Sequence, residues 1–246
     1  MSDDQPKGTL YLVPSLIADI PPLEVLPLAV KKVIDMTEHY IAENEKTARH
    51  FIKKILPNKD QSSLHISTLN KYTDQEELDS LLDPCLQGYP LGLLSEAGAP
   101  GVADPGAEVV IRAHRKKLRI VPLAGPSSIL MSIMASGMNG QNFAFVGYLP
   151  VDRAERRQRI RELERHSRKT GQTQAFIETP YRNGKLFEDL LQFLSPETRL
   201  CLAISISSPQ EFIRTTTVQD WKNMGGIDMH KKPAMFLIDA RPPEDL

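Results

Sequence analysis

The stretch that decides the fold is Ser95-Glu96-Ala97-Gly98-Ala99-Pro100-Gly101-Val102-Ala103-Asp104-Pro105-Gly106, which joins a predicted buried strand at 89–95 to a predicted helix at 105–117. Its three glycines allow the backbone to take positive φ angles and to approach a ligand closely. Ligands of α/β sheets collect at the carboxyl ends of the strands, where this loop begins. Asp104 and Pro105 suit the N-cap and first position of a helix, so for Asp104 by itself capping is the stronger interpretation. The twelve residues together predict a ligand-binding loop.

Strands and helices alternate through the first half of the chain, and this pattern predicts a parallel sheet covered by helices on both faces. The motif Thr73-x-x-Glu76 resembles a capping box at the start of one of these helices. The predicted strands are 8–14, 39–43, 89–95 and 118–123, and the predicted helices are 26–34, 45–56, the segment after Thr73, and 105–117.

The second half has a different pattern. Two consecutive strands, 200–207 and 211–218, are separated by a short polar turn, which indicates an antiparallel hairpin in a mixed sheet. The other predicted elements are strands 143–149, 172–179 and 234–240 and helices 126–137, 152–168 and 187–194. The sequence therefore predicts an α/β protein with two domains, at 1–123 and 124–246.

Two further loops follow predicted strands. Leu123-Ala124-Gly125-Pro126-Ser127-Ser128 starts a helix with small residues and free N–H groups, which suit a polar or anionic ligand group; a plain capped helix is the alternative. Pro14-Ser15 ends the first strand. Three such loops at three strand ends indicate one ligand site, although no dinucleotide, nucleoside-triphosphate or hydrolase fingerprint is present.

Charge and composition narrow the possible classes of protein. The chain has 246 residues, 30 basic and 31 acidic, and its net charge of −1 argues against non-specific coating of nucleic acid. Positive charge is concentrated at 151–170, which contains eight Lys or Arg and four acidic residues. An RNA-backbone site and a solvated helix with internal ion pairs are both open for this segment.

Several classes of site and location are not expected. The two cysteines, Cys85 and Cys201, lie far apart, and no CxxC or HExxH spacing occurs, so we expect no metal site and no disulfide. No apolar run approaches the length of a membrane span, and the polar, acidic N-terminus does not suit a signal peptide. We expect a cytoplasmic protein that does not contact a membrane.

These segments together resemble the tetrapyrrole methylase superfamily, and within it the enzymes that methylate a ribose 2′-oxygen of a 16S ribosomal RNA cytidine. The loops 95–106 and 125–128 are the specific motifs. The matching pieces are Gly8 to Pro14, Ile41-Ala42-Glu43, Leu94 to Gly106, Val121 to Ser128, Ala135-Ser136-Gly137, Phe143 to Pro150 and Glu178-Thr179-Pro180-Tyr181-Arg182.

The resemblance implies a tetrapyrrole methylase-like fold of two α/β domains, S-adenosylmethionine in the cleft between them, ribosomal RNA or the small ribosomal subunit as partner, and a homodimer. Carried over by position, the cofactor contacts are Pro14, Ser95, Glu96, Ala97, Gly98, Asp104, Pro105, Gly106, Gly125, Pro126, Ser127, Ser128, Thr179, Ala203 and Ala234.

Transfer to a ribose hydroxyl also needs a group that takes or directs its proton. Glu43 and Glu178 are the candidates, both at strand ends; alternatively, Glu43 caps the helix at 45–56 and Glu178 holds the turn at Pro180. Candidate substrate contacts are Tyr181, which could stack on a base or pack, and Arg182, which could bind a phosphate or lie at the surface. Arg153, Arg156 and Arg157 are candidates in the basic segment.

The sequence departs from the RNA enzymes at four places: Asn44-Glu45-Lys46, Ser67 to Lys71, the segment Glu178 to Arg182 (E-S-P-H-R in the family), and the uncharged strand end Ile204 to Ser207. The cofactor loops match those of the RNA enzymes, whereas several charged positions of the cleft do not. Two alternatives therefore remain: a tetrapyrrole-type small-molecule methylase, and a non-catalytic homologue that binds S-adenosylmethionine or RNA.

Overall fold

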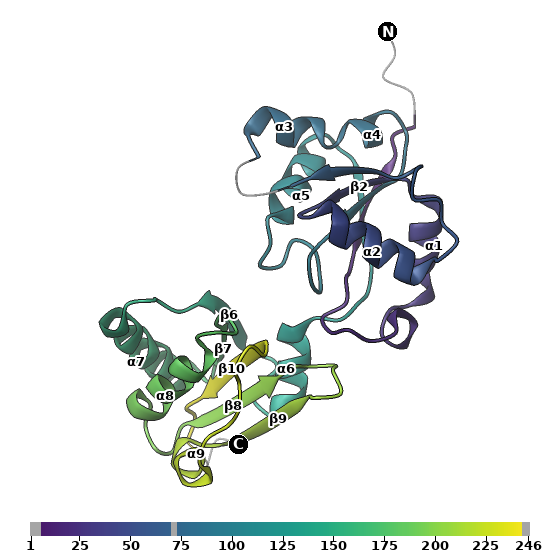
Figure 1. Ribbon diagram of the computed structural model, residues 1–246. Helices are drawn as coiled ribbons and strands as arrows, with labels where there is room; N and C mark the ends of the chain where they lie inside the picture. The colour runs from purple at the N-terminus through teal and green to yellow at the C-terminus, as the bar shows by residue number, and fades with distance from the viewer. Residues whose placement is uncertain (1–5, 70–72, 243–246) are drawn as a thin grey trace. The chain divides into compact units, whose positions relative to one another are not determined.

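The computed structural model describes residues 6–69 and 73–242. The chain divides into two compact units, residues 1–127 and 128–246, and each is described by itself (Figure 1). None of the helices in the described ranges combines the length and the apolar content that a membrane span requires.

The first unit is built on a fully parallel five-stranded sheet with the order β3-β2-β4-β1-β5. Its elements are β1 (Thr9–Val13), η1 (Pro22–Glu24), α1 (Leu28–Met36), β2 (His39–Ala42), α2 (Glu45–Ile55), β3 (His65–Thr68), α3 (Gln75–Ser80), α4 (Asp83–Leu86), β4 (Leu91–Leu94), α5 (Gly106–Arg115) and β5 (Arg119–Pro122). The predicted parallel sheet is confirmed.

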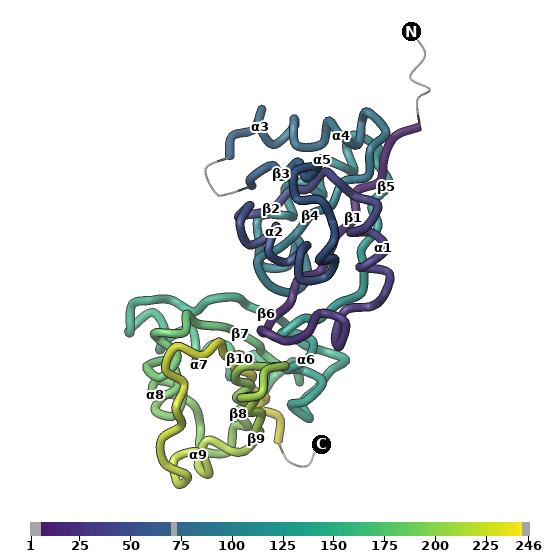
Figure 2. The backbone as a smooth tube through the Cα atoms, turned by 45° about the vertical axis from the view of Figure 1, so that its right-hand side comes forward, coloured from purple at the N-terminus to yellow at the C-terminus, as the bar shows by residue number. Residues whose placement is uncertain are grey.

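Helices cover both faces of this sheet, as the alternation of strands and helices predicts (Figures 1 and 2). Tyr40 and Leu94 belong to a core shared with α1 and α2, whereas Ile41 and Leu93 belong to a core shared with α3, α4 and α5. Neighbouring residues of one strand face opposite cores because successive side chains of a strand point to opposite sides. All four residues of β4 are buried, so this central strand is apolar throughout.

Three local features of the first unit differ from the sequence-based expectation. The edge strand β3 was not predicted, because His65, Ser67 and Thr68 are exposed and give no apolar pattern. The cap of α3 is Asp74, whose side chain accepts a hydrogen bond from the Glu77 N–H, so the capping box expected at Thr73 is wrong by one residue. In the departure at 67–71, Asn70 and Lys71 lie outside the described residues.

The second unit contains a mixed five-stranded sheet with the order β6-β7-β10-β8-β9. β6 and β7 are parallel, and the other neighbouring strands are antiparallel, so the predicted hairpin of β8 and β9 is confirmed. The elements are α6 (Ser128–Ser136), β6 (Phe143–Tyr148), α7 (Arg153–Thr170), β7 (Thr173–Ile177), α8 (Asn183–Phe193), β8 (Arg199–Ile204), β9 (Phe212–Thr217), α9 (Val218–Met224) and β10 (Ala234–Asp239).

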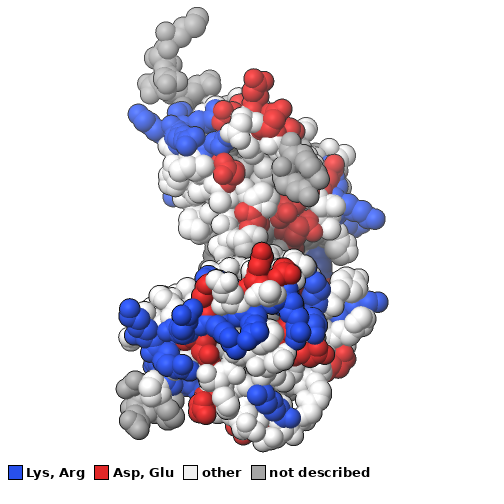
Figure 3. Space-filling model, turned by 90° about the vertical axis from the view of Figure 1, so that its left-hand side faces the viewer, with Lys and Arg blue, Asp and Glu red and all other residues white. Residues whose placement is uncertain are grey.

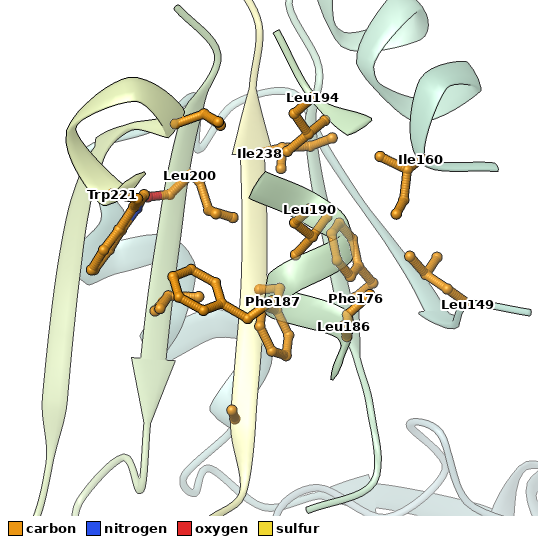
Figure 4. Packing of buried hydrophobic residues seen from close by; sticks show 14 of the residues in the cluster. Leu149, Ile160, Phe176, Leu186, Phe187, Leu190, Leu194, Leu200, Trp221 and Ile238 are labelled. Atoms are coloured by element: carbon orange, nitrogen blue, oxygen red, sulfur yellow. The ribbon is translucent and has the colours of Figure 1, made fainter. Parts of the chain in front are cut away.

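One apolar core joins this sheet to α7, α8 and α9 (Figure 4). Trp221 is buried in it and donates from its indole N–H to the Leu200 carbonyl at 2.8 Å. The Phe187 ring meets Trp221 edge to face, with ring centroids 5.7 Å apart. Such a pair contributes about 0.5–1.5 kcal/mol beyond the burial of its surface. The opposite face of the mixed sheet packs on α6. There the Thr215 hydroxyl of β9 donates a hydrogen bond to the Ser136 carbonyl.

Candidate functional site

Two strand-end loops of the first unit are tied together at one edge of the parallel sheet. The N–H of Ser15, after β1, donates to the Gly98 carbonyl at 2.8 Å, and the Gly98 N–H donates back at 3.2 Å. The Ser15 hydroxyl donates to the Ser95 carbonyl, and the Ser95 hydroxyl donates to the Gly98 carbonyl. Because the strands are parallel, their carboxyl ends share this edge, and the two loops form one hydrogen-bonded platform there.

The third loop, at Gly125 and Pro126, joins the same platform. A Cβ placed on Gly125 would lie 2.3 Å from both Cβ and Cγ of Pro14, so the backbone at Gly125 rests directly on the proline ring. Gly98 has φ +76°, and a Cβ placed there would lie 3.4 Å from the Pro126 carbonyl oxygen. The structure therefore brings together the three loops that the sequence singled out, through contacts that leave little room for side chains.

Asp104 fixes the shape of the long loop. Its Oδ1 accepts the N–H of Gly101 at 2.7 Å and the N–H of Gly106 at 2.8 Å. The helix α5 begins at Gly106 with Pro105 in the cap position, so Asp104 lies one residue earlier than expected but still binds the first helical N–H. Gly106 has no positive φ; a Cβ there would meet Leu93 and Asp104, so close packing explains this glycine.

Three carboxylates lie near these loops. Burial raises the pKa of Glu43, and the negative charges of Asp104 and Glu96 raise it further, while the Glu96 N–H lowers it in part. Burial also raises the pKa of Asp104 against the effect of its two hydrogen bonds. The Thr47 hydroxyl donates to Glu96 Oε1 at 2.8 Å. The site therefore combines negative charge with a carboxyl group, Glu43, whose pKa lies above its ordinary value.

A pocket of about 230 Å³ opens beside this platform, between α2 and the ends of β1, β2 and β4. Ser15, Thr47, Ser95 and Glu96 line it. Lys54 and Asp19 also line it and form an ion pair, with Lys54 Nζ 2.5 Å from Asp19 Oδ1. Sites for cofactor-sized ligands usually exceed about 300 Å³. This pocket is therefore large enough for one portion of such a ligand.

Two residues of the first unit were missed by the sequence analysis. Asn44 caps α2, since its Oδ1 accepts the N–H groups of Lys46 and Thr47, so the alternative that Glu43 is this cap is wrong. An Asn before a helical run is a recognised cap signal that could have found it. No local sequence pattern could have identified Thr47, because its hydrogen bond to Glu96 joins residues 49 positions apart.

Glu178 of the second unit is engaged in its own turn. Its side chain is 2 % exposed, and its Oε1 accepts the Thr179 N–H at 2.6 Å and two N–H groups of Arg182 at 3.0 and 2.7 Å. The interpretation that it holds the turn at Pro180 therefore agrees with the contacts. Arg182 is half-exposed, and Tyr181 is 74 % exposed with its ring edge 6.4 Å from His230.

The remaining candidate cofactor residues of the second unit share one edge of the mixed sheet. Met235 of β10 pairs with Ile177 on one side and with Ala203 on the other. Ala203 and Ala234 therefore lie close together, and Thr179 follows the strand that ends beside them. Ser128 is the first residue of α6.

The three candidate arginines of α7 have different surroundings. Arg156 is buried and donates to Asp189 at 2.6 Å and to the carbonyls of Pro150 and Val151, so its guanidinium stabilises the fold. Arg153 is 55 % exposed and pairs with the other oxygen of Asp189 at 3.1 Å. Arg157 is exposed.

No group of three or more His, Cys, Asp and Glu residues within residues 6–69 and 73–242 could hold a metal ion. Cys85 and Cys201 are free and buried.

Comparison with known proteins reveals relatives along almost the whole chain. No protein-family model matches it. A protein named ribosomal RNA small subunit methyltransferase I from Vibrio cholerae serotype O1 is 30% identical, over 97% of this chain and 80% of its own length. A protein of the same name from Halalkalibacterium halodurans is 28% identical, over 85% of this chain and 68% of its own length.

Solved structures share the fold. A uroporphyrin-III C-methyltransferase from Thermus thermophilus, complexed with S-adenosylhomocysteine, has a TM-score of 0.57 at 16% identity and covers 94% of this chain and 97% of its own. A cobalt precorrin-4 methyltransferase has a TM-score of 0.60 at 17% identity and covers 94% of both chains. The fold expected from the sequence is confirmed.

Proposed function

Because the chain belongs to the family of ribosomal RNA small subunit methyltransferase I, we propose that it transfers the methyl group of S-adenosylmethionine to ribosomal RNA, at the ribose 2′-oxygen of a 16S rRNA cytidine. The observation that carries the proposal is the relative that is 30% identical over 97% of this chain. The loops of the first unit support it, since three of them meet at one sheet edge beside the carboxyl groups of Glu43, Glu96 and Asp104.

The residues of the first unit fit a sulfonium nucleoside. Gly98 and Gly125 let the loops pack closely against one another, because a Cβ at either position would collide with or crowd a neighbouring loop. The exposed Glu96 and the partly buried Glu43 supply negative charge, which suits a cationic ligand. In this proposal Pro14, 95–98, 104–106 and 125–127 hold the cofactor. Ser128, Thr179, Ala203 and Ala234 are the contacts proposed for the second unit.

Bound S-adenosylmethionine supplies a methyl group already activated by its sulfonium. The protein's part is to hold donor and acceptor in line and to manage one proton, and orientation provides most of the rate gain. Hydrogen bonds join Ser15, Ser95 and Gly98, so the platform of loops at this sheet edge is formed before any ligand binds. Preorganised backbone groups lose little freedom when they bind.

Glu43 is the better candidate for the group that receives the ribose hydroxyl proton. Burial and the charges of Asp104 and Glu96 raise the pKa of Glu43, which makes its carboxylate a stronger base. Glu178 instead accepts three N–H groups within its own turn and has 2 % of its side chain exposed. We therefore assign Glu178 the role of positioning Thr179 and Arg182.

Location and assembly follow from the same proposal. A ribosomal substrate implies action in the cytoplasm, and the resemblance to the tetrapyrrole methylase superfamily implies a homodimer. Sedimentation equilibrium of the pure protein would give twice the 27.6 kDa chain mass. A single-chain mass at micromolar concentration would contradict the dimer.

A small-molecule methylase is the second candidate function. Two observations favour it: the fold neighbours are methyltransferases of uroporphyrin-III and cobalt precorrin-4, and the end of β8 is uncharged at Ile204 to Ser207. A protein that binds but does not transfer is the third.

One experiment separates the three. The protein is incubated with tritiated S-adenosylmethionine and small ribosomal subunits from a strain that lacks this methylation, and in parallel with uroporphyrinogen III. Label that co-migrates with a 2′-O-methylcytidine after RNA digestion supports the proposal. Label in the tetrapyrrole supports the second candidate, and label in neither acceptor supports the third.

A further inference from the structure

Three arginines form a stripe along α7. Arg157, Arg161 and Arg165 are all exposed and recur at intervals of four residues, which places them on one helix face about 6 Å apart along the axis. No carboxylate oxygen of the described residues lies within 4.0 Å of their guanidinium nitrogens. Like charges at this spacing destabilise a helix. The charge of Arg165 also acts on Glu162 and helps to lower the pKa of that carboxyl, so the row is only partly compensated and favours an anionic partner.

The other arginines of α7 form ion pairs, whereas the exposed Lys169 in its last turn forms none among the described residues. Arg153 and Arg156 pair with Asp189, Arg159 pairs with Glu162 and Arg168 pairs with Glu164. The helix is therefore not uniformly neutralised, and the unpaired charge is concentrated on the stripe.

A broad groove runs beside the stripe. It has a volume of about 870 Å³ and lies between α7 and the end of α8, where Gln192, Phe193 and Ser195 line it. The one carboxylate in its lining, Glu164, is buried and accepts hydrogen bonds from the Ser195 N–H and the Thr198 hydroxyl. The exposed charge of the groove is therefore positive. Figure 3 faces this side of the unit and shows basic side chains gathered in a band.

Phe193 holds two guanidinium groups at the mouth of this groove. The Arg153 and Arg157 guanidinium carbons lie 5.5 and 5.6 Å from the centre of its ring. Cation–π contacts of this length contribute about 0.5–1 kcal/mol at exposed sites. Arg157 is therefore partly ordered before a ligand arrives.

We propose that the groove of Arg157, Arg161 and Arg165 binds consecutive phosphates of the RNA substrate, an inference that rests on the proposed function. Guanidinium groups bind phosphate oxygens in a bidentate manner, and a row along one helix suits a repeating anion. The proposed function supplies RNA as the polyanion, and the regular spacing of the three guanidinium groups along α7 suits a chain that carries one negative charge per unit. The contacts are to the backbone, so they position the RNA without reading its bases.

The test compares the wild-type protein with the triple variant Arg157→Gln, Arg161→Gln, Arg165→Gln. Methyl transfer to small subunits is measured against salt concentration, and binding of 16S rRNA is followed by fluorescence anisotropy. We expect KM for RNA and Kd to rise at least ten-fold, with kcat and KM for the donor unchanged. Each phosphate contact contributes about 0.7–0.9 to the slope of log affinity against log salt, so the slope should fall by about 2.

A matched control removes the same charge elsewhere. Lys32, Lys53 and Arg115 are exposed in the first unit, and their triple exchange for Gln should leave the slope within about 0.5 of wild type. If the α7 triple variant fails to fold by circular dichroism, Arg161→Gln alone should lower the slope by about 0.7–0.9. Phe193→Leu should weaken RNA binding with no loss of slope.

The outcomes separate the inference from the proposed function. A wild-type protein that transfers no methyl group overturns the function, while its RNA-binding slope still tests the groove. An unchanged slope and Kd in the α7 variant overturn the groove, as does an equal loss in the control variant. Unchanged RNA binding with lost binding to purified small-subunit proteins would assign the groove to a protein partner and overturn it too.

Discussion

Gly125 lies against Pro14 so closely that a Cβ on the glycine would stand 2.3 Å from two carbons of the proline ring. The two residues lie in the loops that follow β1 and β5, which are neighbouring strands of the parallel sheet. The contact therefore sets how near two loops of the proposed cofactor site approach each other. It also explains the glycine by close packing of the backbone.

Replacing Gly125 by Val should separate these loops. We expect KM for the methyl donor to rise at least ten-fold and the free energy of unfolding to fall by about 1–3 kcal/mol, the usual cost of forced overpacking. Steady-state kinetics and urea unfolding measure the two effects.

Gly184→Ala is the matched control, since nothing lies within 4 Å of a Cβ at that helical position. It should leave KM unchanged and raise stability by up to about 1 kcal/mol. A Gly125→Val protein with the wild-type KM for the donor would show that this loop does not hold it.

The sequence predicted the elements that place the site but not the contacts that complete it. The buried strand before Ser95 and the glycines and prolines of the loops are local signals, so the three loops could be predicted as one site. The edge strand β3 is exposed and carries no apolar pattern. The pairing of Arg156 with Asp189 joins residues 33 positions apart, so no local pattern distinguishes this buried arginine from the exposed Arg157.

The pH dependence of methyl transfer should report on Glu43. Because burial and nearby negative charges raise its pKa, the active carboxylate form is lost as the pH falls through a value above the ordinary 4.5. Glu96→Gln removes one of those charges, so the acid limb of the kcat profile should move to lower pH. Glu43→Gln should lower kcat by roughly 10²–10⁴-fold, the usual contribution of a general base.

Glu96→Gln keeps the backbone N–H that Glu43 accepts, so a shift of the acid limb would report the lost charge of the Glu96 side chain. An acid limb that does not move in Glu96→Gln, together with a Glu43→Gln protein of near wild-type kcat, would remove Glu43 from the proton path.

Asp104 should matter for the shape of its loop. Asp104→Ala leaves the N–H groups of Gly101 and Gly106 without their acceptor and should cost about 1–3 kcal/mol of unfolding free energy. Asp104→Asn keeps an oxygen at the same place and should cost less. Equal losses in the two variants, measured by urea unfolding, would show that the carboxylate charge matters more than the hydrogen bonds.

The ion pair of Arg156 and Asp189 should contribute to the stability of the fold and not to RNA binding. Asp189 is fully buried, so Asp189→Asn should lower the free energy of unfolding by about 3–5 kcal/mol, the cost of leaving a buried charge unpaired. Arg159→Gln, which breaks a partly exposed pair with Glu162, should cost much less, because ion pairs in contact with solvent contribute little. Similar losses in both would contradict the assignment.

The sign of the pH effect provides a second check. Burial by itself would raise the pKa of Asp189, but hydrogen bonds and charge from Arg156 and Arg153 outweigh it and lower the pKa below 3.8. The stability that this carboxylate contributes is therefore present above pH 3.8 and is lost as the pH falls through the lower folded value. Asp189→Asn should abolish that part of the acid transition.

Isothermal titration calorimetry with S-adenosylhomocysteine tests the central claim most directly, because it asks whether the three loops bind the cofactor without requiring any RNA. We expect a saturable heat of one ligand per chain, with a Kd tighter than about 100 μM, and at least ten-fold weaker binding in Gly125→Val. The absence of any heat with wild-type protein at millimolar ligand would contradict the account.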